Sequence, residues 1–183
     1  MVVGILGSPR RGGNCDILLE QCLKGAKESG ATVRKFVLRE LKMTPCQGCN
    51  TCLSSGECMV VDDMREVHRA LLEADAVVVA SPIYFSGPTC ITKCMIDRCQ
   101  CLWARENLLG RKVDHPRKGV ILLVGGDPEA VFRNAQSELK AFFKGIGITF
   151  HAEIMIAGVE KLGEMRERQA DLRRALEIGK ELA

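Results

Sequence analysis

Short apolar segments alternate with longer amphipathic segments along the whole chain. The segments that predict strands are Val2–Gly7, Thr32–Leu38, Ala76–Ala80, Gly119–Val124 and Gly147–Ile156. Val2–Gly7 is continuously apolar, which is typical of a parallel strand buried on both faces, while Thr32–Leu38 alternates like an outer strand. Five strands separated by helices imply right-handed crossovers. The pattern therefore predicts an α/β fold with a doubly wound parallel sheet.

The segments between the strands predict helices. Asn14 can cap the first helix, which ends before Gly30, and Asp62-Asp63 places acidic residues at the positive end of the second. Further helices are expected at Pro88–Trp103, Pro128–Lys144 and Glu160–Leu182. The 183 residues contain no repeat, low-complexity tract or long linker, so we expect a single domain over residues 1–183. Residues 42–61 are the one insertion that resembles a subdomain.

Composition excludes several classes of protein. A formal net charge of +3 is too small to indicate a nucleic acid or a membrane surface as partner. No apolar run approaches the roughly 20 residues of a membrane span, and the N-terminus has no signal-peptide pattern. The 10 cysteines accompany regular helices and strands, unlike the disulfide scaffolds of small secreted proteins. We therefore expect reduced thiols or metal ligands in a cytoplasmic protein.

Four of these cysteines, Cys46, Cys49, Cys52 and Cys58, have the spacing C-x₂-C-x₂-C-x₅-C. Thiolates two residues apart on a tight loop converge on one side, as they do around an iron–sulfur cubane. A zinc site is more often assembled from two cysteine pairs on separate segments. The spacing therefore favours one [4Fe–4S] loop. A structural zinc site, which would make the chain an interaction module, and surface thiols without metal remain the alternatives.

The loop after the first predicted strand, Gly7-Ser8-Pro9-Arg10-Arg11-Gly12-Gly13-Asn14, leads into a helix. A helix N-terminus at the carboxyl edge of a parallel sheet offers free N–H groups to an anion. Ser8 and Asn14 can hydrogen-bond a phosphate, Arg10 can add charge, and Gly12-Gly13 lets the backbone approach. The loop matches neither the Walker A nor the dinucleotide fingerprint. It favours a phosphate site over an ordinary glycine-rich turn with solvated arginines.

Two further loops are expected at the same edge of the sheet. Ser81-Pro82-Ile83-Tyr84-Phe85-Ser86-Gly87-Pro88 follows the third predicted strand and carries two aromatic side chains on a proline-stiffened turn. Such a loop can flank a flat ring, although the aromatic side chains could also only plug the loop. Gly125-Gly126-Asp127 follows the fourth strand and is a weaker candidate wall of the same site.

Several segments together resemble the NADPH-dependent FMN reductase superfamily, and its iron–sulfur flavoproteins in particular. They are Gly7–Arg10 with Asn14, Pro45 with the four cysteines, Asp62-Asp63-Met64 and Ser81–Phe85. The resemblance implies a flavodoxin-like fold with strand order 2-1-3-4-5, FMN, and a [4Fe–4S] cluster on Cys46, Cys49, Cys52 and Cys58. It places the FMN phosphate at Ser8, Arg10, Gly13, Asn14 and Cys15, although relatives often have threonine where Cys15 stands. It places the flavin ring against Pro82, Ile83, Tyr84, Phe85 and Ser86 and against Gly125, Gly126 and Asp127.

The resemblance also implies function and assembly. The chain would be a flavin-dependent oxidoreductase that couples a cluster to FMN, with a ferredoxin-type donor or NAD(P)H as electron source and a two-electron acceptor. It would form a homodimer or homotetramer in which the cluster of one protomer serves the flavin of a neighbour. An NAD(P)H-dependent FMN or quinone reductase without a cluster is the alternative. No side chain is expected to act as a catalytic acid or base, because the cofactors supply the chemistry.

The remaining cysteines and histidines suggest no second site. Cys90, Cys94 and Cys101 fall on one stripe of the predicted helix after Pro88, with Cys99 off it. Buried cysteines that behave as small apolar side chains explain this stripe better than a metal does. No histidine is placed beside a nucleophile, so solvated or hydrogen-bonded histidines are expected.

Overall fold

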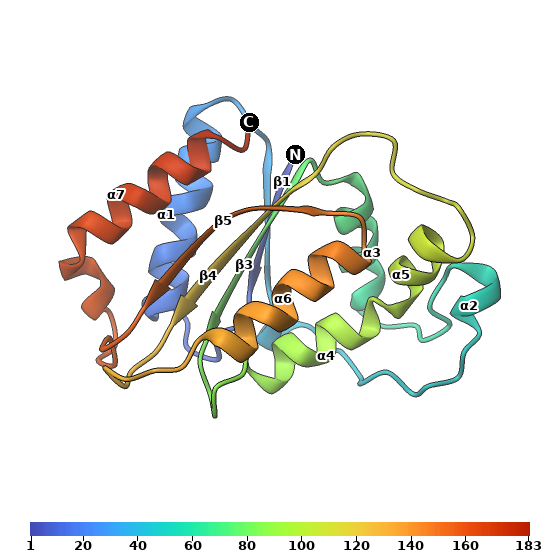
Figure 1. Cartoon of the computed structure of the whole chain (residues 1–183), viewed down its shortest axis with the longest axis horizontal. Coiled ribbons are helices and arrows are strands. Elements are labelled where there is room, and N and C mark those ends of the chain that lie inside the picture. Colours follow the sequence, from blue (N-terminus) through green and yellow to red (C-terminus); the bar gives the residue numbers. More distant parts are fainter.

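The computed structural model describes residues 1–183 and contains one five-stranded sheet in the order β2-β1-β3-β4-β5 (Figure 1). The strands are β1 Val2–Leu6, β2 Val33–Val37, β3 Ala76–Pro82, β4 Lys118–Val124 and β5 Thr149–Ile156. All four neighbouring pairs are parallel. The predicted doubly wound, flavodoxin-like sheet is confirmed. Because the strands are parallel, the loops that follow them gather at one edge.

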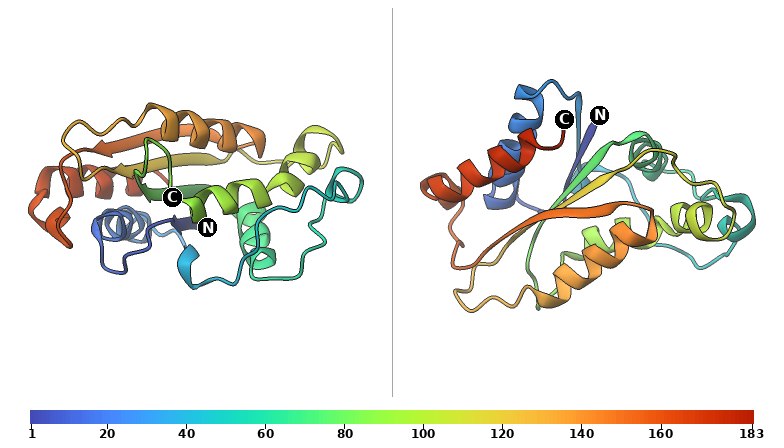
Figure 2. Two further views of the ribbon diagram at one scale, coloured as in Figure 1. Left: turned by 90° about the horizontal axis from the view of Figure 1, so that it is seen from below. Right: turned by 45° about the horizontal axis from the view of Figure 1, so that its top comes forward.

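Helices cover both faces of the sheet (Figures 1 and 2). One face carries α1 Asn14–Glu28 and α7 Gln169–Lys180, and the other carries α3 Met64–Glu73, α4 Cys90–Arg98, α5 Gln100–Asn107 and α6 Arg133–Gly145. Successive residues of β1 enter different cores, since Val3 and Ile5 pack with α3 and α6 while Val2 and Leu6 pack with α1 and α7. This double burial explains the continuously apolar strand. No helix has the length and apolar character needed to cross a membrane.

The contact between α1 and α7 depends on two glycines. A Cβ atom on Gly25 would lie 2.0 Å from the carbonyl oxygen of Leu176, and one on Gly179 would lie 1.9 Å from that of Cys22. Neither carbonyl can move without disturbing its helix. Glycine therefore allows the two backbones to touch.

Three predicted helices differ from the structure. The predicted helix Pro88–Trp103 is two helices in the structure, because the chain turns at Cys99 between α4 and α5. The first of them, α4, begins only after Thr89, whose side chain accepts a hydrogen bond from the Thr92 N–H. The helix predicted from Pro128 begins at Arg133, since Asp127 holds a turn through the N–H of Glu129. The last predicted helix is divided into the 3₁₀ turns η2 Glu164–Glu167 and α7, with Gly163 at a φ of 81° before η2.

The cysteine-rich segment is a loop that is held together at its base. It runs from η1, Leu38–Glu40, to α3, and its one regular element is the short helix α2, Cys52–Ser55. The Asp63 carboxylate accepts a hydrogen bond from the Lys42 N–H at 2.7 Å, and the Asp62 carboxylate accepts one from the Thr44 N–H at 3.1 Å. The two ends of the loop are thus tied together next to α3.

Candidate functional site

A cavity of about 520 Å³ lies at the carboxyl edge of the sheet, among the loops that follow β1, β3, β4 and β5. It brings together nine residues that were expected from the sequence to bind FMN: Ser8, Arg10, Asn14, Cys15, Pro82, Ile83, Tyr84, Gly126 and Asp127. Four other expected residues do not line it: Gly13, Phe85, Ser86 and Gly125. The cavity adds Val124, Pro128, Val159 and Glu160. Val159 and Glu160 follow β5, so the parallel topology was a signal that could have located them.

The loop after β1 presents the N-terminus of α1 to this cavity. Ser8 is buried, and its hydroxyl accepts a hydrogen bond from the Arg10 N–H at 3.1 Å. The Arg10 guanidinium reaches the Glu160 carbonyl at 3.3 Å and lines the cavity. The first N–H groups of a helix have no intrahelical partner. This rim can therefore accept an anion through backbone N–H groups and one arginine.

Asn14 has a different role from the one predicted. The residue that caps α1 is Gly13, and Asn14 is the first helical residue. Its side-chain amide donates to the Lys161 carbonyl at 2.9 Å and the Val159 carbonyl at 3.3 Å, and its oxygen accepts from the Met165 N–H at 3.1 Å. The prediction of an Asn14 cap is wrong. The side chain instead joins the first loop of the rim to the last.

The loop after β3 ends in a tight hairpin turn. The backbone N–H and carbonyl groups of Tyr84 and Gly87 pair at 2.9 and 3.0 Å, and the two residues between them, Phe85 and Ser86, have φ values of 50° and 64°. Non-glycine residues rarely adopt positive φ. Phe85 is fully exposed to solvent, while Tyr84 is half-exposed and lines the cavity. The turn directs Phe85 away from the cavity.

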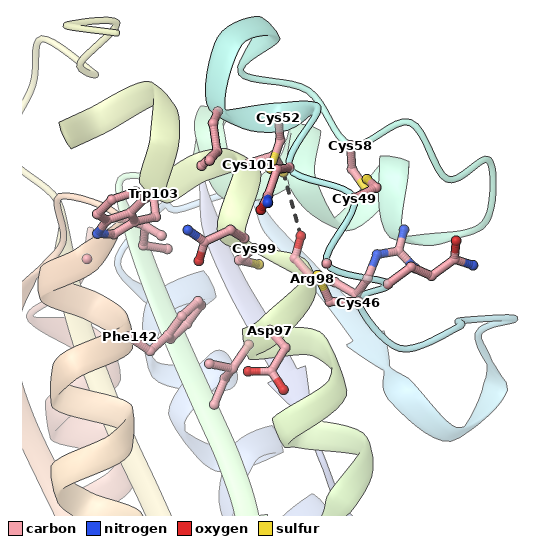
Figure 3. A pocket seen from close by; sticks show the side chains of 18 of the residues that line it. Cys46, Cys49, Cys52, Cys58, Asp97, Arg98, Cys99, Cys101, Trp103 and Phe142 are labelled. Carbon is pink, nitrogen blue, oxygen red and sulfur yellow. Dashed lines mark hydrogen bonds between the residues drawn. The ribbon is translucent and has the colours of Figure 1, made fainter. Parts of the chain in front are cut away.

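A second cavity, of about 840 Å³, lies between the cysteine loop, α4, α5 and α6 (Figure 3). All four cysteines of the predicted cluster line it: Cys46, Cys49, Cys52 and Cys58. Trp103, Phe142 and Ile146 are among its apolar lining residues. No residue lines both cavities. The molecule therefore has two separate candidate sites.

The backbone of the cysteine loop adopts left-handed conformations between its first three cysteines. Gly48 and Asn50 have φ values of 64° and 59°, so each two-residue spacer contains a left-handed residue. Successive residues of opposite hand turn their N–H groups into one concavity, which favours negative charge. The pKa of the Cys49 thiol is lowered, chiefly because the backbone N–H and then the side chain of Thr51 hydrogen-bond to it. The loop is therefore suited to hold a thiolate.

The donor set agrees with a cluster better than with one metal ion. All ten cysteines are free of disulfides. Burial raises the pKa of the Cys52 thiol, and the charges of Cys58, Cys46 and Cys49 raise it further, so the four sulfurs are near enough to interact. No group of three or more His, Cys, Asp or Glu side chains lies close enough to hold a single ion. A tetrahedral zinc needs every sulfur about 2.3 Å from one point, whereas in a cubane each thiolate binds its own iron.

Buried side chains on α3 and α5 lie beneath this cavity. His68 is buried and hydrogen-bonds through Nε2 to the Arg98 carbonyl at 2.9 Å, and burial lowers its pKa to about 4. Cys101 is also buried, which raises the pKa of its thiol to about 12. Cys22 and Cys99 are also buried, but Cys90 is exposed and Cys94 is half-buried. The prediction that the α4 cysteines are interior is therefore wrong for Cys90.

The comparisons with known proteins agree with this geometry. Residues 1–158 match the family model described as NADPH-dependent FMN reductase. The chain belongs to the NADPH-dependent FMN reductase family. It is 37% identical over 182 residues to an iron–sulfur flavoprotein of Archaeoglobus fulgidus, covering 99% of this chain and 78% of that protein. A second iron–sulfur flavoprotein of that organism is 38% identical over 127 residues, 69% of this chain and 63% of that protein.

The fold is shared with proteins of lower sequence identity. The structure of an NAD(P)H:quinone oxidoreductase from Methanothermobacter marburgensis superposes with a TM-score of 0.73 at 22% identity, covering 99% of this chain and 94% of that chain. The family match and the named relatives support a flavin-dependent oxidoreductase of the iron–sulfur flavoprotein type, for which FMN and an iron–sulfur cluster are the expected cofactors. The two cavities are the candidate sites for these two groups.

Proposed function

We propose that this chain transfers electrons between a [4Fe–4S] cluster in the cysteine cavity and FMN in the cavity at the carboxyl edge of the sheet. The observation that carries the proposal is the separation of the two cavities. Four cysteines line one, and a helix N-terminus with an arginine lines the other. One is suited to a soft metal cluster and the other to a phosphate.

Each cavity has residues with a distinct task. The backbone at the start of α1, with Ser8 and Arg10, would hold the FMN phosphate. Pro82, Tyr84 and Gly126 would lie along the ring, and Cys46, Cys49, Cys52 and Cys58 would ligate iron. FMN exchanges electrons singly or in pairs and a cluster exchanges them singly, so the pair can join a one-electron donor to a two-electron acceptor. The side chains bind and orient the cofactors, and none is needed as a catalytic acid or base.

The physiological setting is also part of the proposal. A ferredoxin-like protein would supply single electrons, with NAD(P)H as the alternative source. The chain would act in the cytoplasm as a homodimer or homotetramer. Phe85, fully exposed on its tight turn and directed away from the cavity, would be a suitable contact for a neighbouring protomer, because aromatic side chains are enriched at such interfaces.

Metal and flavin analysis of anaerobically purified protein tests the proposal. We expect a brown protein with iron and acid-labile sulfide in the ratio of a [4Fe–4S] cluster, and one equivalent of FMN. Flavin without iron would leave an NAD(P)H-dependent FMN or quinone reductase. Zinc without sulfide or flavin would instead indicate an interaction module on a flavodoxin-like scaffold.

A further inference from the structure

Arg98, the last residue of α4, places a buried guanidinium at the wall of the cysteine cavity (Figure 3). The residue is only 2% exposed. Its two terminal nitrogens donate to the two carboxylate oxygens of Asp62 at 2.6 and 2.9 Å. Nη1 also donates to the Thr44 carbonyl at 2.7 Å. A two-point pair of this kind fixes the plane of the guanidinium.

The contacts of Arg98 lie at both ends of the cysteine loop. Thr44 precedes the first cysteine by two residues, and Asp62 follows the last by four. Asp62 also accepts from the N–H of Thr44, so the two ends and the helix form one hydrogen-bonded unit. The guanidinium therefore clamps the loop to α4 at a fixed position.

One donor of this buried group has no partner within the protein. Nε of Arg98 is fully enclosed and makes no hydrogen bond. A buried N–H without an acceptor costs about 1–3 kcal/mol, so native structures rarely leave one unpaired. The Cys58 side chain lies beside the guanidinium and is among the groups that raise the Arg98 pKa. Cys58 and Arg98 both line the cysteine cavity, so the Cys58 sulfur is an acceptor that could satisfy this donor.

We propose that Arg98 is a positioning residue that donates its Nε–H to the Cys58 thiolate of the cluster site and thereby raises the cluster's reduction potential. The proposal deepens the function given above and depends on it. One-electron reduction by an external reductant such as dithionite adds one negative charge to the cluster without breaking a bond. Hydrogen bonds to the ligand sulfurs stabilise that added charge, which raises the potential.

The Asp62 carboxylate makes the direction of the shift in reduction potential testable. Because Asp62 balances the charge of the guanidinium, a cluster in this cavity would face the Nε–H group of an ion pair that carries no net charge. Replacing Arg98 by glutamine removes the donor and leaves the Asp62 charge uncompensated, and both effects disfavour electron addition. Replacing Asp62 by asparagine leaves the arginine charge uncompensated and favours electron addition. A clamp with only a structural role would loosen equally in both variants and could not produce opposite shifts.

Redox titrations of the holoprotein, followed by the electron paramagnetic resonance signal of the reduced cluster, provide the test. We expect Arg98→Gln to lower the reduced-to-oxidised ratio at fixed ambient potential at least tenfold, about 59 mV for a one-electron couple. Asp62→Asn should raise the same ratio. Arg98→Lys keeps the charge but loses the Nε donor, so its potential should fall between those of Arg98→Gln and the wild type.

Lys93→Gln is the matched control. Lys93 lies on the same helix, lines the same cavity and pairs with Asp97 at 2.6 Å, but its side chain is half-exposed. Solvent and salt screen such a charge, so its removal should change the ratio less than about threefold. Iron content is measured for every variant, so the comparison includes only protein that carries a full cluster.

Each outcome decides between the proposals. Opposite shifts in Arg98→Gln and Asp62→Asn, both larger than that of Lys93→Gln, support the role of Arg98. Shifts in the same direction, shifts no larger than the control, or loss of iron from every variant would limit Arg98 to holding the loop and overturn the tuning role. Wild-type protein that carries no iron would overturn the proposed function itself, which is a separate result.

Discussion

The two cavities are built in different ways. The cavity at the carboxyl edge of the sheet, which we propose for FMN and call the FMN cavity, lies among short loops whose ends are fixed by neighbouring strands, so the register of the sheet determines its shape. The cysteine cavity depends on a long loop with one short helix, held at its base by Asp62 and Asp63. The walls of the FMN cavity are part of the framework, whereas those of the cysteine cavity depend on side-chain contacts. Changes at one cavity should therefore affect the other little.

Substitution of a proposed cluster ligand should separate the cavities most completely. Cys52→Ser, and equally serine at positions 46, 49 and 58, should abolish the visible cluster absorbance and the bound iron, because serine is a poor ligand for this soft site. FMN should remain bound in equal amount. Cys90→Ser on the exposed face of α4 is the control and should keep both cofactors. Joint loss of FMN and iron from the Cys52 variant would contradict the independence of the two cavities.

The framework itself can be weakened at the contact of α1 with α7. In Gly179→Ala the new methyl group would lie 1.9 Å from the Cys22 carbonyl oxygen, so the free energy of unfolding should fall by about 3 kcal/mol. Denaturant titration measures the change, and iron per folded molecule should stay constant. Gly145→Ala is a milder control, since its methyl group would meet only the Trp103 ring at 3.3 Å. An equal loss in both variants would show that close backbone contact is not the cause.

Acid should destabilise the protein through His68, which lies beneath the cysteine cavity. Burial holds the pKa of His68 at about 4, below its ordinary value of 6.5, so the unfolded chain binds a proton more readily than the folded one. Stability should therefore fall as pH drops from about 6.5 to 4, by about 2 kcal/mol between pH 7 and 5. Denaturant titration at the two pH values provides the measurement. His68→Gln should remove most of this dependence, and an unchanged dependence would exclude His68 as its source.

The smallest expected effect concerns the rim of the FMN cavity. Asn14→Ala removes three hydrogen bonds that join the first and last loops of the rim. We expect FMN to bind about tenfold more weakly, or about 1.4 kcal/mol, with iron content unchanged. Asn107→Ala is a close match, because its amide also donates to two backbone carbonyls, at 2.9 and 2.8 Å, but far from this rim. Equal weakening of FMN binding in both variants would remove the special role of Asn14. Fluorescence titration of free flavin measures the affinity.

The sheet could be predicted because each strand carries its own signal. The segment Ala76–Ala80 is apolar throughout and is followed by Ser81 and Pro82, and the crossover rule then fixes the topology up to strand order. The helix that was predicted to begin at Pro128 was placed too early because local propensity does not reveal the Asp127 turn. The break at Cys99 was equally invisible, since both flanking segments favour helix.

The site could be predicted in part for a similar reason. Loops after strands gather at one edge, so Ser8, Pro82 and Gly126 were expected to lie together, and in the structure they do. The side-chain bonds of Asn14 to a loop about 150 residues away could not be read from its own neighbourhood. The pairing of Arg98 with Asp62 is likewise a tertiary contact without a local signal. Periodicity reveals which segments meet, but it does not reveal which polar groups pair.

Anomalous diffraction from anaerobically grown crystals, recorded on both sides of the iron absorption edge, tests the central claim most directly. Our account predicts an iron peak enclosed by Cys46, Cys49, Cys52 and Cys58, together with flavin density in the cavity bordered by Ser8. A peak at the zinc edge in its place, or flavin density inside the cysteine cavity, would contradict the assignment of one cofactor to each cavity.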